Sequence, residues 1–300
     1  MTIQDLINFG VKKLSKTSNS AVLDSEVLLS YVLNKPKLDI FVHMDKNVHK
    51  LQMRKFFDLL KKRSQGWPVA YLVKEKEFYK LKFYVDKNVL IPRPETEGLV
   101  ELAVTYIKRS HKIGTDRNPL RILDIGTGSG NIIISLAKSL YNLSPITYNL
   151  FASDISPKAL AVAKKNAKIH KVKITFKQGS LHKPWNNQNF DIIVANLPYL
   201  AKRTDVSTKF EPTKALIAKN KGLELFEELF KQIAHLRTVR SSDRTTKQSK
   251  PLSVFVEIGH DQGPDIKKLA KKYMSGFKIE IVKDLSNRIR FLCLSANNSD

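Results

Sequence analysis

The fold class of this chain can be inferred from one segment, Ile122-Leu-Asp-Ile-Gly-Thr-Gly-Ser-Gly130. It has the pattern of a buried strand with an acid at Asp124, then three glycines spaced two residues apart, and a helix expected at Asn131–Leu140. Glycine accepts positive φ and lets a ligand approach the backbone closely. The start of a helix also leaves unpaired N–H groups. The pattern indicates a small-molecule site, but a tight strand-to-helix turn needs small residues for its own sake.

The elements around this loop alternate between strand and helix. Strands are expected at Leu120–Asp124, Asn149–Asp154, Lys173–Lys177, Asp191–Ala195, Leu252–Ile258, Phe277–Lys283 and Ile289–Leu294. Helices are expected at Asn131–Leu140, Pro157–His170, Gly222–Leu236 and Pro264–Lys272. This alternation is typical of a doubly wound α/β fold. Residues 238–250 are polar and basic without apolar periodicity, and we expect a mobile surface insertion there.

The first part of the chain has a different pattern. Apolar residues recur at helical spacing up to about residue 65, where Gly66-Trp67-Pro68 interrupts them. Short alternating segments at Ala70–Val73, Lys76–Tyr79 and Leu81–Val85 then suggest a hairpin. We therefore predict three parts: a small helical domain at 1–70, a β-hairpin linker at 71–92 and an α/β domain at 93–300.

Composition limits the class of protein. The chain has 300 residues, an ordinary hydrophobic fraction of 42% and no run of the ~20 apolar residues that a membrane span needs. The N-terminus lacks a signal pattern, and the single cysteine, Cys293, excludes a disulfide framework or a multi-cysteine metal site. We expect a cytosolic protein with no metal. The net charge of +24 fits either a nucleic-acid or ribosome partner, or lysines spread over all solvated faces.

A second motif, Phe190-Asp-Ile-Ile-Val-Ala-Asn-Leu-Pro-Tyr199, follows about seventy residues later. It predicts a buried strand that runs into an Asn-x-Pro-Tyr turn. The Asn196 amide oxygen and the Leu197 carbonyl would accept the two hydrogens of a planar NH2 group, Pro198 would stiffen the turn, and Tyr199 would stack on the group's face. Alone, the motif fits a plain turn equally well; beside the glycine loop it indicates catalysis.

The glycine loop lacks the glycine at 131 that a nicotinamide fingerprint requires. It instead resembles the S-adenosylmethionine loop of class I methyltransferases, in which Asp124 would face the cationic methionine portion. Asp154 would take the ribose hydroxyls or cap the helix that starts at Pro157. Ser180 lies where such folds contact adenine. The expected cofactor residues are Asp124, Gly126, Thr127, Gly128, Gly130, Asp154, Ile155, Ser180 and Asn196.

Together the motifs resemble the HemK/PrmC family, the N5-glutamine methyltransferases of peptide chain release factors. The resemblance covers nearly the whole chain and rests on the helical N-terminal region, Val89-Leu-Ile-Pro-Arg-Pro-Glu-Thr-Glu97, Asp124–Gly130, Asn196–Tyr199, Phe210-Glu-Pro212, Gly222-Leu223 and Glu257-x-Gly-x-x-Gln-Gly263. It implies a Rossmann-like methyltransferase domain behind a substrate-recognition domain. It also implies methyl transfer from S-adenosylmethionine to the glutamine of a Gly-Gly-Gln motif.

The resemblance implies a substrate site made of Arg93, Glu95 and the turn at 196–199. Arg93 fits equally well as a structural ion pair with Glu95 or Glu97. Two positions depart from the family pattern: Leu197 stands where the first of two prolines is usual, and Ser180 where an acid is common. A backbone carbonyl survives the first change, so we expect the turn to be looser but functional.

Two other functions remain open. A methyltransferase acting on adenine or guanine amino groups would use the same turn, and the basic charge favours it; the Val89–Glu97 run and the helical N-terminal region favour a protein substrate. A non-catalytic ribosome- or RNA-binding protein on this fold is the second, although Asp124, Asp154 and Asn196 are all intact. The sequence does not indicate which release factor is preferred or the oligomeric state.

Overall fold

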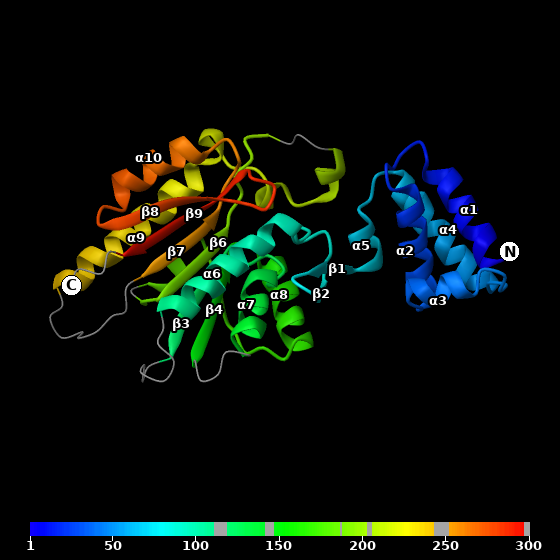
Figure 1. Ribbon diagram of the computed structural model, residues 1–300, viewed down its shortest axis with the longest axis horizontal. Helices are drawn as coiled ribbons and strands as arrows, with labels where there is room; N and C mark the ends of the chain where they lie inside the picture. Colours follow the sequence, from blue (N-terminus) through cyan, green and yellow to red (C-terminus); the bar gives the residue numbers. More distant parts are fainter. Residues whose placement is uncertain (111–118, 142–146, 187, 203–205, 243–251, 297–300) are drawn as a thin grey trace. The chain divides into compact units, whose positions relative to one another are not determined.

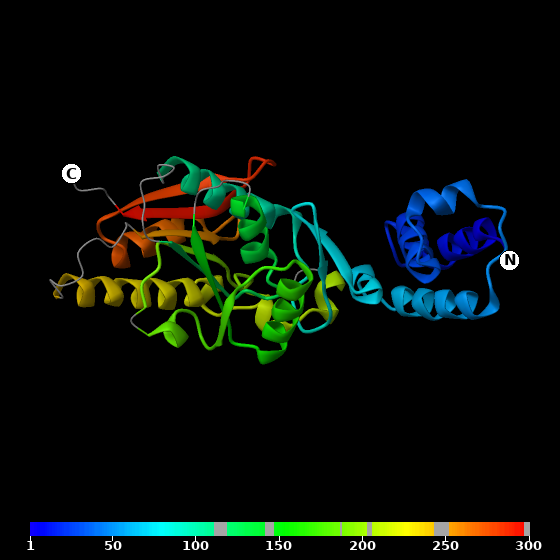
Figure 2. The ribbon, with the colours of Figure 1, turned by 90° about the horizontal axis from the view of Figure 1, so that it is seen from below.

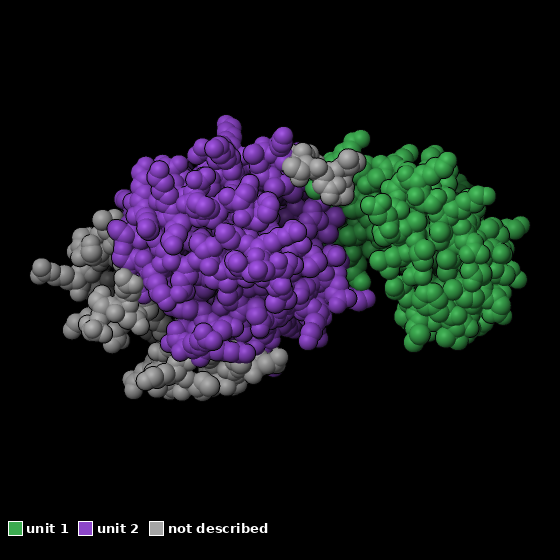
Figure 3. All heavy atoms as spheres, turned by 45° about the horizontal axis from the view of Figure 1, so that its top comes forward, with its two compact units in different colours: residues 1–75, 85–87, 204–210 green, residues 76–84, 88–203, 211–300 purple. Residues whose placement is uncertain are grey.

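The computed structural model describes residues 1–110, 119–141, 147–186, 188–202, 206–242 and 252–296. It divides into two compact units, coloured in Figure 3. Unit 1 comprises residues 1–75, 85–87 and 204–210, and unit 2 comprises residues 76–84, 88–203 and 211–300. Within the described ranges, no helix has the length and apolar character needed to cross a membrane.

Unit 1 is helical, with α1 (Ile3–Leu14), α2 (Ala21–Leu33), α3 (Lys37–Val42), α4 (Lys50–Ser64) and α5 (Val69–Val73). A capping box starts α1, because the Thr2 hydroxyl accepts from Asp5 N at 3.1 Å and the Asp5 carboxylate accepts from Thr2 N at 2.9 Å. Apolar faces of these helices, including Leu6, Leu28 and Phe56, form one buried core.

The strand expected at Ala70–Val73 is wrong: these residues form the one-turn helix α5 after Pro68. Its adjacent residues Tyr71 and Leu72 are both buried, which a strand with one solvent-exposed face would not allow. The hairpin itself is present as β1 (Glu75–Phe78) and β2 (Leu81–Tyr84). Its two turn residues, 79 and 80, both have positive φ, as a type I′ turn requires.

Unit 2 contains the predicted doubly wound α/β sheet (Figure 1). Its strands are β3 (Leu120–Ile125), β4 (Tyr148–Asp154), β5 (Thr175–Gln178), β6 (Ile192–Asn196), β7 (Ser253–Glu257), β8 (Phe277–Lys283) and β9 (Ile289–Ala296). They lie in the order β5-β4-β3-β6-β7-β9-β8, and β9 runs antiparallel to both neighbours. The chain changes direction across the sheet at β3, so the loops after β3 and β6 leave the same edge side by side.

Helices cover both faces of this sheet. One core contains residues of α6 (Glu97–Ser110), α7 (Asn131–Tyr141) and α8 (Pro157–Ile169). The other contains residues of α9 (Glu224–Ser242) and α10 (Gly263–Tyr273). Figure 2 shows α9, in yellow, on the side of the sheet opposite α6. Short 3-10 turns are η1 (Pro94–Thr96), η2 (Lys183–Trp185), η3 (Val206–Phe210), η4 (Thr213–Ala215) and η5 (Asn220–Gly222).

The insertion expected at 238–250 is partly corrected. Helix α9 continues to Ser242, so residues 238–242 are helical rather than irregular. Apolar periodicity marks the buried face of a helix and not its end, so the loss of that periodicity at 238 did not mark where the helix stops. Residues 243–250 lie outside the described residues.

Candidate active site

A cavity of about 630 Å³ lies at the carboxyl edge of β3, β4 and β6. Its volume falls within the roughly 300–1,000 Å³ of small-molecule sites. The predicted site residues that line it are Arg93, Gly126, Thr127, Gly128, Asp154, Ile155, Ser180, Asn196, Leu197 and Pro198. Asp124, Gly130, Glu95 and Tyr199 do not line it. The cavity is also lined by a segment that was not predicted as part of the site, at residues 212–215 and 217–219.

The glycine loop takes the backbone conformation that its composition predicts. Gly126 has φ +70° and Gly130 has φ +80°. A Cβ at position 130 would lie 3.1 Å from Ile134 Cδ1 and 3.3 Å from Ala163 Cβ. The third glycine therefore allows α7 and α8 to pack closely, while the first two line the cavity.

Asp154 at the end of β4 holds the loop from the other side. Its Oδ2 accepts from Gly128 N at 2.9 Å, and its Oδ1 accepts from Ser156 N at 2.8 Å. Burial raises the pKa of Asp154, and these N–H groups oppose that rise. The helix-capping role considered for Asp154 belongs to Ser156, whose hydroxyl accepts from Ala159 N at 3.2 Å. Asp154 therefore does not cap the helix; it lines the cavity and holds the glycine loop through Gly128 N.

Asp124 lies fully buried beneath the loop. Its Oδ2 accepts from the Thr127 hydroxyl at 2.7 Å, and its Oδ1 has no hydrogen-bond partner in the part of the chain that the structure describes. Burial raises the pKa of Asp124 to about 7. Because Asp124 lies behind the loop and not in the cavity wall, its carboxylate suits a ligand that brings positive charge to the loop without a direct contact.

The Asn196 amide is oriented by two neighbours. Its Nδ2 donates to Thr96 Oγ1 at 3.1 Å and to Glu257 Oε2 at 3.0 Å. Both amide hydrogens are thereby used, and Oδ1 remains as an acceptor on a residue that lines the cavity. Among the described residues no donor is hydrogen-bonded to the adjacent Leu197 carbonyl. The turn therefore offers two acceptors side by side.

Tyr199 makes its polar contact away from the cavity. Its hydroxyl donates to Glu257 Oε1 at 3.1 Å, and its ring packs against the core beneath α9 and α10. Burial raises the pKa of Tyr199, and the Glu257 charge adds to that rise. The stacking role expected for this ring stays a prediction.

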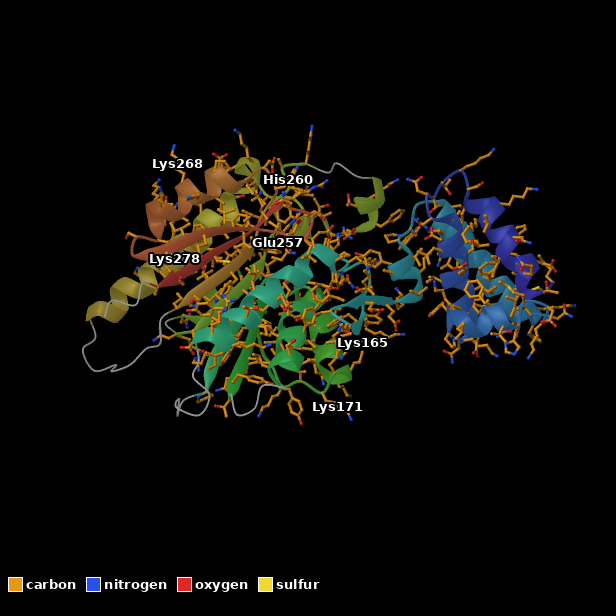
Figure 4. The ribbon with its side chains drawn as sticks, in the orientation of Figure 1. Lys165, Lys171, Glu257, His260, Lys268 and Lys278 are labelled. Atoms are coloured by element: carbon orange, nitrogen blue, oxygen red, sulfur yellow. The ribbon has the colours of Figure 1, made fainter. Side chains whose placement is uncertain are left out.

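Two residues of this network were not predicted as site residues. Thr96 is buried in η1, and Glu257, labelled in Figure 4, ends β7 with 1% of its surface exposed. Burial raises the pKa of Glu257, while the Thr96 hydroxyl and the Arg290 charge lower it. The sequence did hold a signal: Asn196 and Glu257 each end a buried strand, and the two strands pair in register at these residues.

Arg93 forms an ion pair, but with an acid that the sequence did not suggest. Its Nη2 lies 2.6 Å from Glu211 Oε1, and Glu211 Oε2 accepts from Ile91 N at 3.2 Å. The expected pairing with Glu95 or Glu97 is wrong. Glu95 is exposed, and Glu97 accepts from Tyr79 N at 2.8 Å in the hairpin. Arg93 therefore anchors Glu211, the residue directly before the cavity-lining segment that starts at Pro212.

The sheet order, glycine loop and acceptor turn define a class I methyltransferase. Family models described as "PrmC N-terminal domain" and "Methyltransferase domain" match residues 5–73 and 116–279. A Bacillus cereus protein named release factor glutamine methyltransferase is 31% identical over 274 residues, or 89% of this chain and 90% of that protein. The chain belongs to the release factor glutamine methyltransferase family.

Two further comparisons agree. A Dictyoglomus turgidum protein of the same name is 39% identical over 236 residues, which cover 75% of this chain and 77% of the relative. Among solved structures, the hMettl16 catalytic domain in complex with MAT2A 3′UTR hairpin 6 has a TM-score of 0.51 at 14% identity. The match covers 85% of this chain and 84% of the hMettl16 chain. At 14% identity it supports a shared fold and nothing more.

Proposed function

We propose that this protein transfers a methyl group from S-adenosylmethionine to the side-chain amide nitrogen of the glutamine in the Gly-Gly-Gln motif of peptide chain release factors. The observation that carries the proposal is the orientation of Asn196. With both hydrogens of its amide donated to Thr96 and Glu257, it presents Oδ1 on the wall of a cavity formed by a glycine loop.

The cavity suits this cofactor. Asp124 lies beneath the loop and not in the cavity wall, so its carboxylate would favour the positively charged methionine portion without touching it, while the Asp154 carboxylate in the wall fits ribose hydroxyls. Ile155 is 57% exposed and lines the cavity, as an apolar contact for a purine would. Ser180 lies in the same wall and offers a hydroxyl. When bound, S-adenosylmethionine supplies the methyl group on a positively charged sulfur.

The turn would orient the glutamine amide. An amide nitrogen attacks poorly because its lone pair is delocalised into the carbonyl. Asn196 Oδ1 and the Leu197 carbonyl would accept its two hydrogens, align the nitrogen and stabilise positive charge as it forms. The product of the transfer is a methyl amide that still carries both hydrogens on a positively charged nitrogen. This cation is acidic enough to lose one proton to water. Accordingly, the described lining of the cavity contains no histidine to serve as a base.

The helical region at 1–70 is proposed to recognise the release factor. Its match to the PrmC N-terminal domain model and the names of the relatives support this assignment. The hairpin linker at 71–92 and the catalytic domain at 93–300 complete the proposed division. In this division Arg93 and Glu95 would face the bound substrate from the start of the catalytic domain.

Incubation with methyl-labelled S-adenosylmethionine tests the function. The purified chain would be offered a release factor, the same factor with Gln→Ala in its Gly-Gly-Gln motif, and bulk DNA and RNA. We expect label on the intact factor, at the glutamine, and on none of the others. Label on nucleic acid alone would establish the amino-group methyltransferase instead, and cofactor binding without any label would favour the non-catalytic alternative.

A further inference from the structure

We propose that Glu257 is a positioning residue that fixes the Asn196 amide with its oxygen toward the cavity, and so restricts the methyl acceptor to a group that donates hydrogens. The inference rests on the proposed function and deepens it, because it assigns the choice of acceptor chemistry to a residue that does not line the cavity.

An amide side chain has two ends of nearly equal shape and opposite hydrogen-bonding character. Nothing in the shape of a cavity wall decides which end faces inward. The orientation of the amide is set by the hydrogen-bond partner that faces it from the protein interior. That partner is Glu257 Oε2, 3.0 Å from Asn196 Nδ2. Both Glu257 oxygens accept hydrogen bonds, Oε2 from Asn196 Nδ2 and Oε1 from the Tyr199 hydroxyl, so Oε2 selects the NH2 end of Asn196 and leaves the amide oxygen for the substrate.

The second partner of the amide does not make this choice. The Thr96 hydroxyl accepts from Asn196 Nδ2 at 3.1 Å and gives its single hydrogen to Glu257, so its own orientation also follows from the carboxylate. The selection therefore depends on the carboxylate. A reversed Asn196 would place its oxygen against Glu257 Oε2, two acceptors facing each other at a site with 1% exposure and little room for water.

The carboxylate is itself held in place. Glu257 Oε1 accepts from the Tyr199 hydroxyl at 3.1 Å, so both ends of the Asn196–Tyr199 turn are bonded to one side chain. The pairing of β6 with β7 in register at Asn196 and Glu257 sets the separation of the two backbones. Tyr199, expected to act on the substrate, thus also orients the acid that orients Asn196.

A charge-swap cycle tests this coupling. Asn196→Asp alone would place two carboxylates in contact, and they would have to share a proton. Glu257→Gln alone would remove the selection, because a glutamine amide pairs with either end of Asn196. In the double variant Asn196→Asp/Glu257→Gln, the new amide would donate to the new carboxylate. The second oxygen of the introduced aspartate would again face the cavity as an acceptor.

The measurement is kcat and KM for a release factor, with cofactor Kd as the test of folding. We expect each single variant to lose on the order of 100-fold in kcat, with cofactor Kd within a few-fold of wild type. The double variant should recover at least about tenfold over Asn196→Asp. A double variant no better than the product of the two single losses would overturn the inference, as would Glu257→Gln with near-normal kcat.

Glu211→Gln is the matched control. Glu211 is also buried, but its carboxylate contacts Arg93 and Ile91 N instead of Asn196. Combined with Asn196→Asp, it should give no recovery. The wild-type reaction separates the two claims: if wild type labels no glutamine the proposed function fails, whereas normal wild-type labelling with no recovery in the cycle sinks only the role of Glu257.

Discussion

Leu197 packs over Gly126: its Cδ2 would lie 3.3 Å from a Cβ at position 126. The Leu197 side chain is 3% exposed. The turn after β6 and the glycine loop after β3 thus touch through Leu197, which stands in place of the first of the two prolines in the family pattern. Leucine contributes packing here, and the carbonyl that we propose accepts from the substrate belongs to the backbone.

Leu197→Pro should therefore keep most of the activity. Asn196 ends a strand, an extended conformation that a following proline favours. No described residue accepts a hydrogen bond from Leu197 N, so proline removes no bond. We expect kcat within about threefold of wild type and a change of roughly 1 kcal/mol or less in the free energy of unfolding. A loss as large as that of an Asn196 variant would show that the leucine side chain itself is required.

Asn196→Ala should abolish transfer and spare cofactor binding. It removes the side-chain acceptor for the substrate NH2. Removal of such a group typically lowers kcat by ~10²–10³-fold. The Leu197 carbonyl and the glycine loop stay in place. Single-turnover rates with a release factor and calorimetric cofactor Kd provide the check; near-normal turnover would remove Asn196 from the mechanism.

Cofactor affinity should depend on pH through Asp124. Its pKa of about 7 means that the carboxylate of the free protein becomes protonated below neutral pH and loses its attraction for a cation. We expect the Kd for S-adenosylmethionine to rise about tenfold per pH unit as the pH falls below 7. Titrations at pH 5.5, 6.5 and 8 test this. Asp124→Asn should bind weakly at all three, and a wild-type Kd independent of pH would contradict the assignment.

The same group should make the cofactor-free protein less stable at high pH. The folded-state pKa of Asp124 lies above the unfolded value of 3.8, so its stabilising contribution is complete below that value and is lost as the pH rises toward 7. Asp124→Asn should therefore unfold at higher denaturant than wild type at pH 8. The advantage should shrink by roughly 1.4 kcal/mol per pH unit between pH 7 and 5. An advantage that stays constant over this range would indicate another cause.

Gly222→Ala should displace the acceptor turn. A Cβ at position 222 would lie 1.9 Å from the Tyr199 carbonyl oxygen and 2.6 Å from Gln262 Nε2, which itself donates to that carbonyl. We expect a large loss of kcat and a lower melting temperature. Gly66→Ala is the control, because that glycine also has positive φ but its nearest neighbour would be 3.5 Å away. It should cost only the ~1–2 kcal/mol of a left-handed backbone. Equal effects of the two substitutions would rule out the contact with Tyr199.

The sequence predicted the central strands of the sheet well because β3, β6 and β7 are short apolar runs whose residues are nearly all buried. It failed where local pattern and tertiary burial disagree. Tyr71 and Leu72 are neighbours in the chain, yet both are buried because they lie on a single helical turn instead of a strand. The end of α9 was placed too early because residues 238–242 are helical but show no apolar periodicity in the sequence.

The candidate site was predictable wherever its residues belong to one motif. The glycine loop and the 196–199 turn each show their chemistry locally. The partners of these motifs come from distant segments: Thr96 and Glu257 hold Asn196, and Glu211 holds Arg93, 118 residues away in sequence. Sequence spacing carries no record of such contacts, so Arg93 was predicted to bind substrate or to pair with Glu95 or Glu97, and its pairing with Glu211 was missed.

The separation of Asn196 from Glu257 also has a consequence for synthesis of the chain. The two residues are 61 positions apart, and β7 must be added to the sheet before the amide is held. A nascent chain that has emerged only as far as Tyr199 already carries the glycine loop and the whole 196–199 turn. It does not yet carry Glu257, the acid that orients Asn196. Competence for methyl transfer is therefore expected to arise late, when the ribosome has released the last third of unit 2.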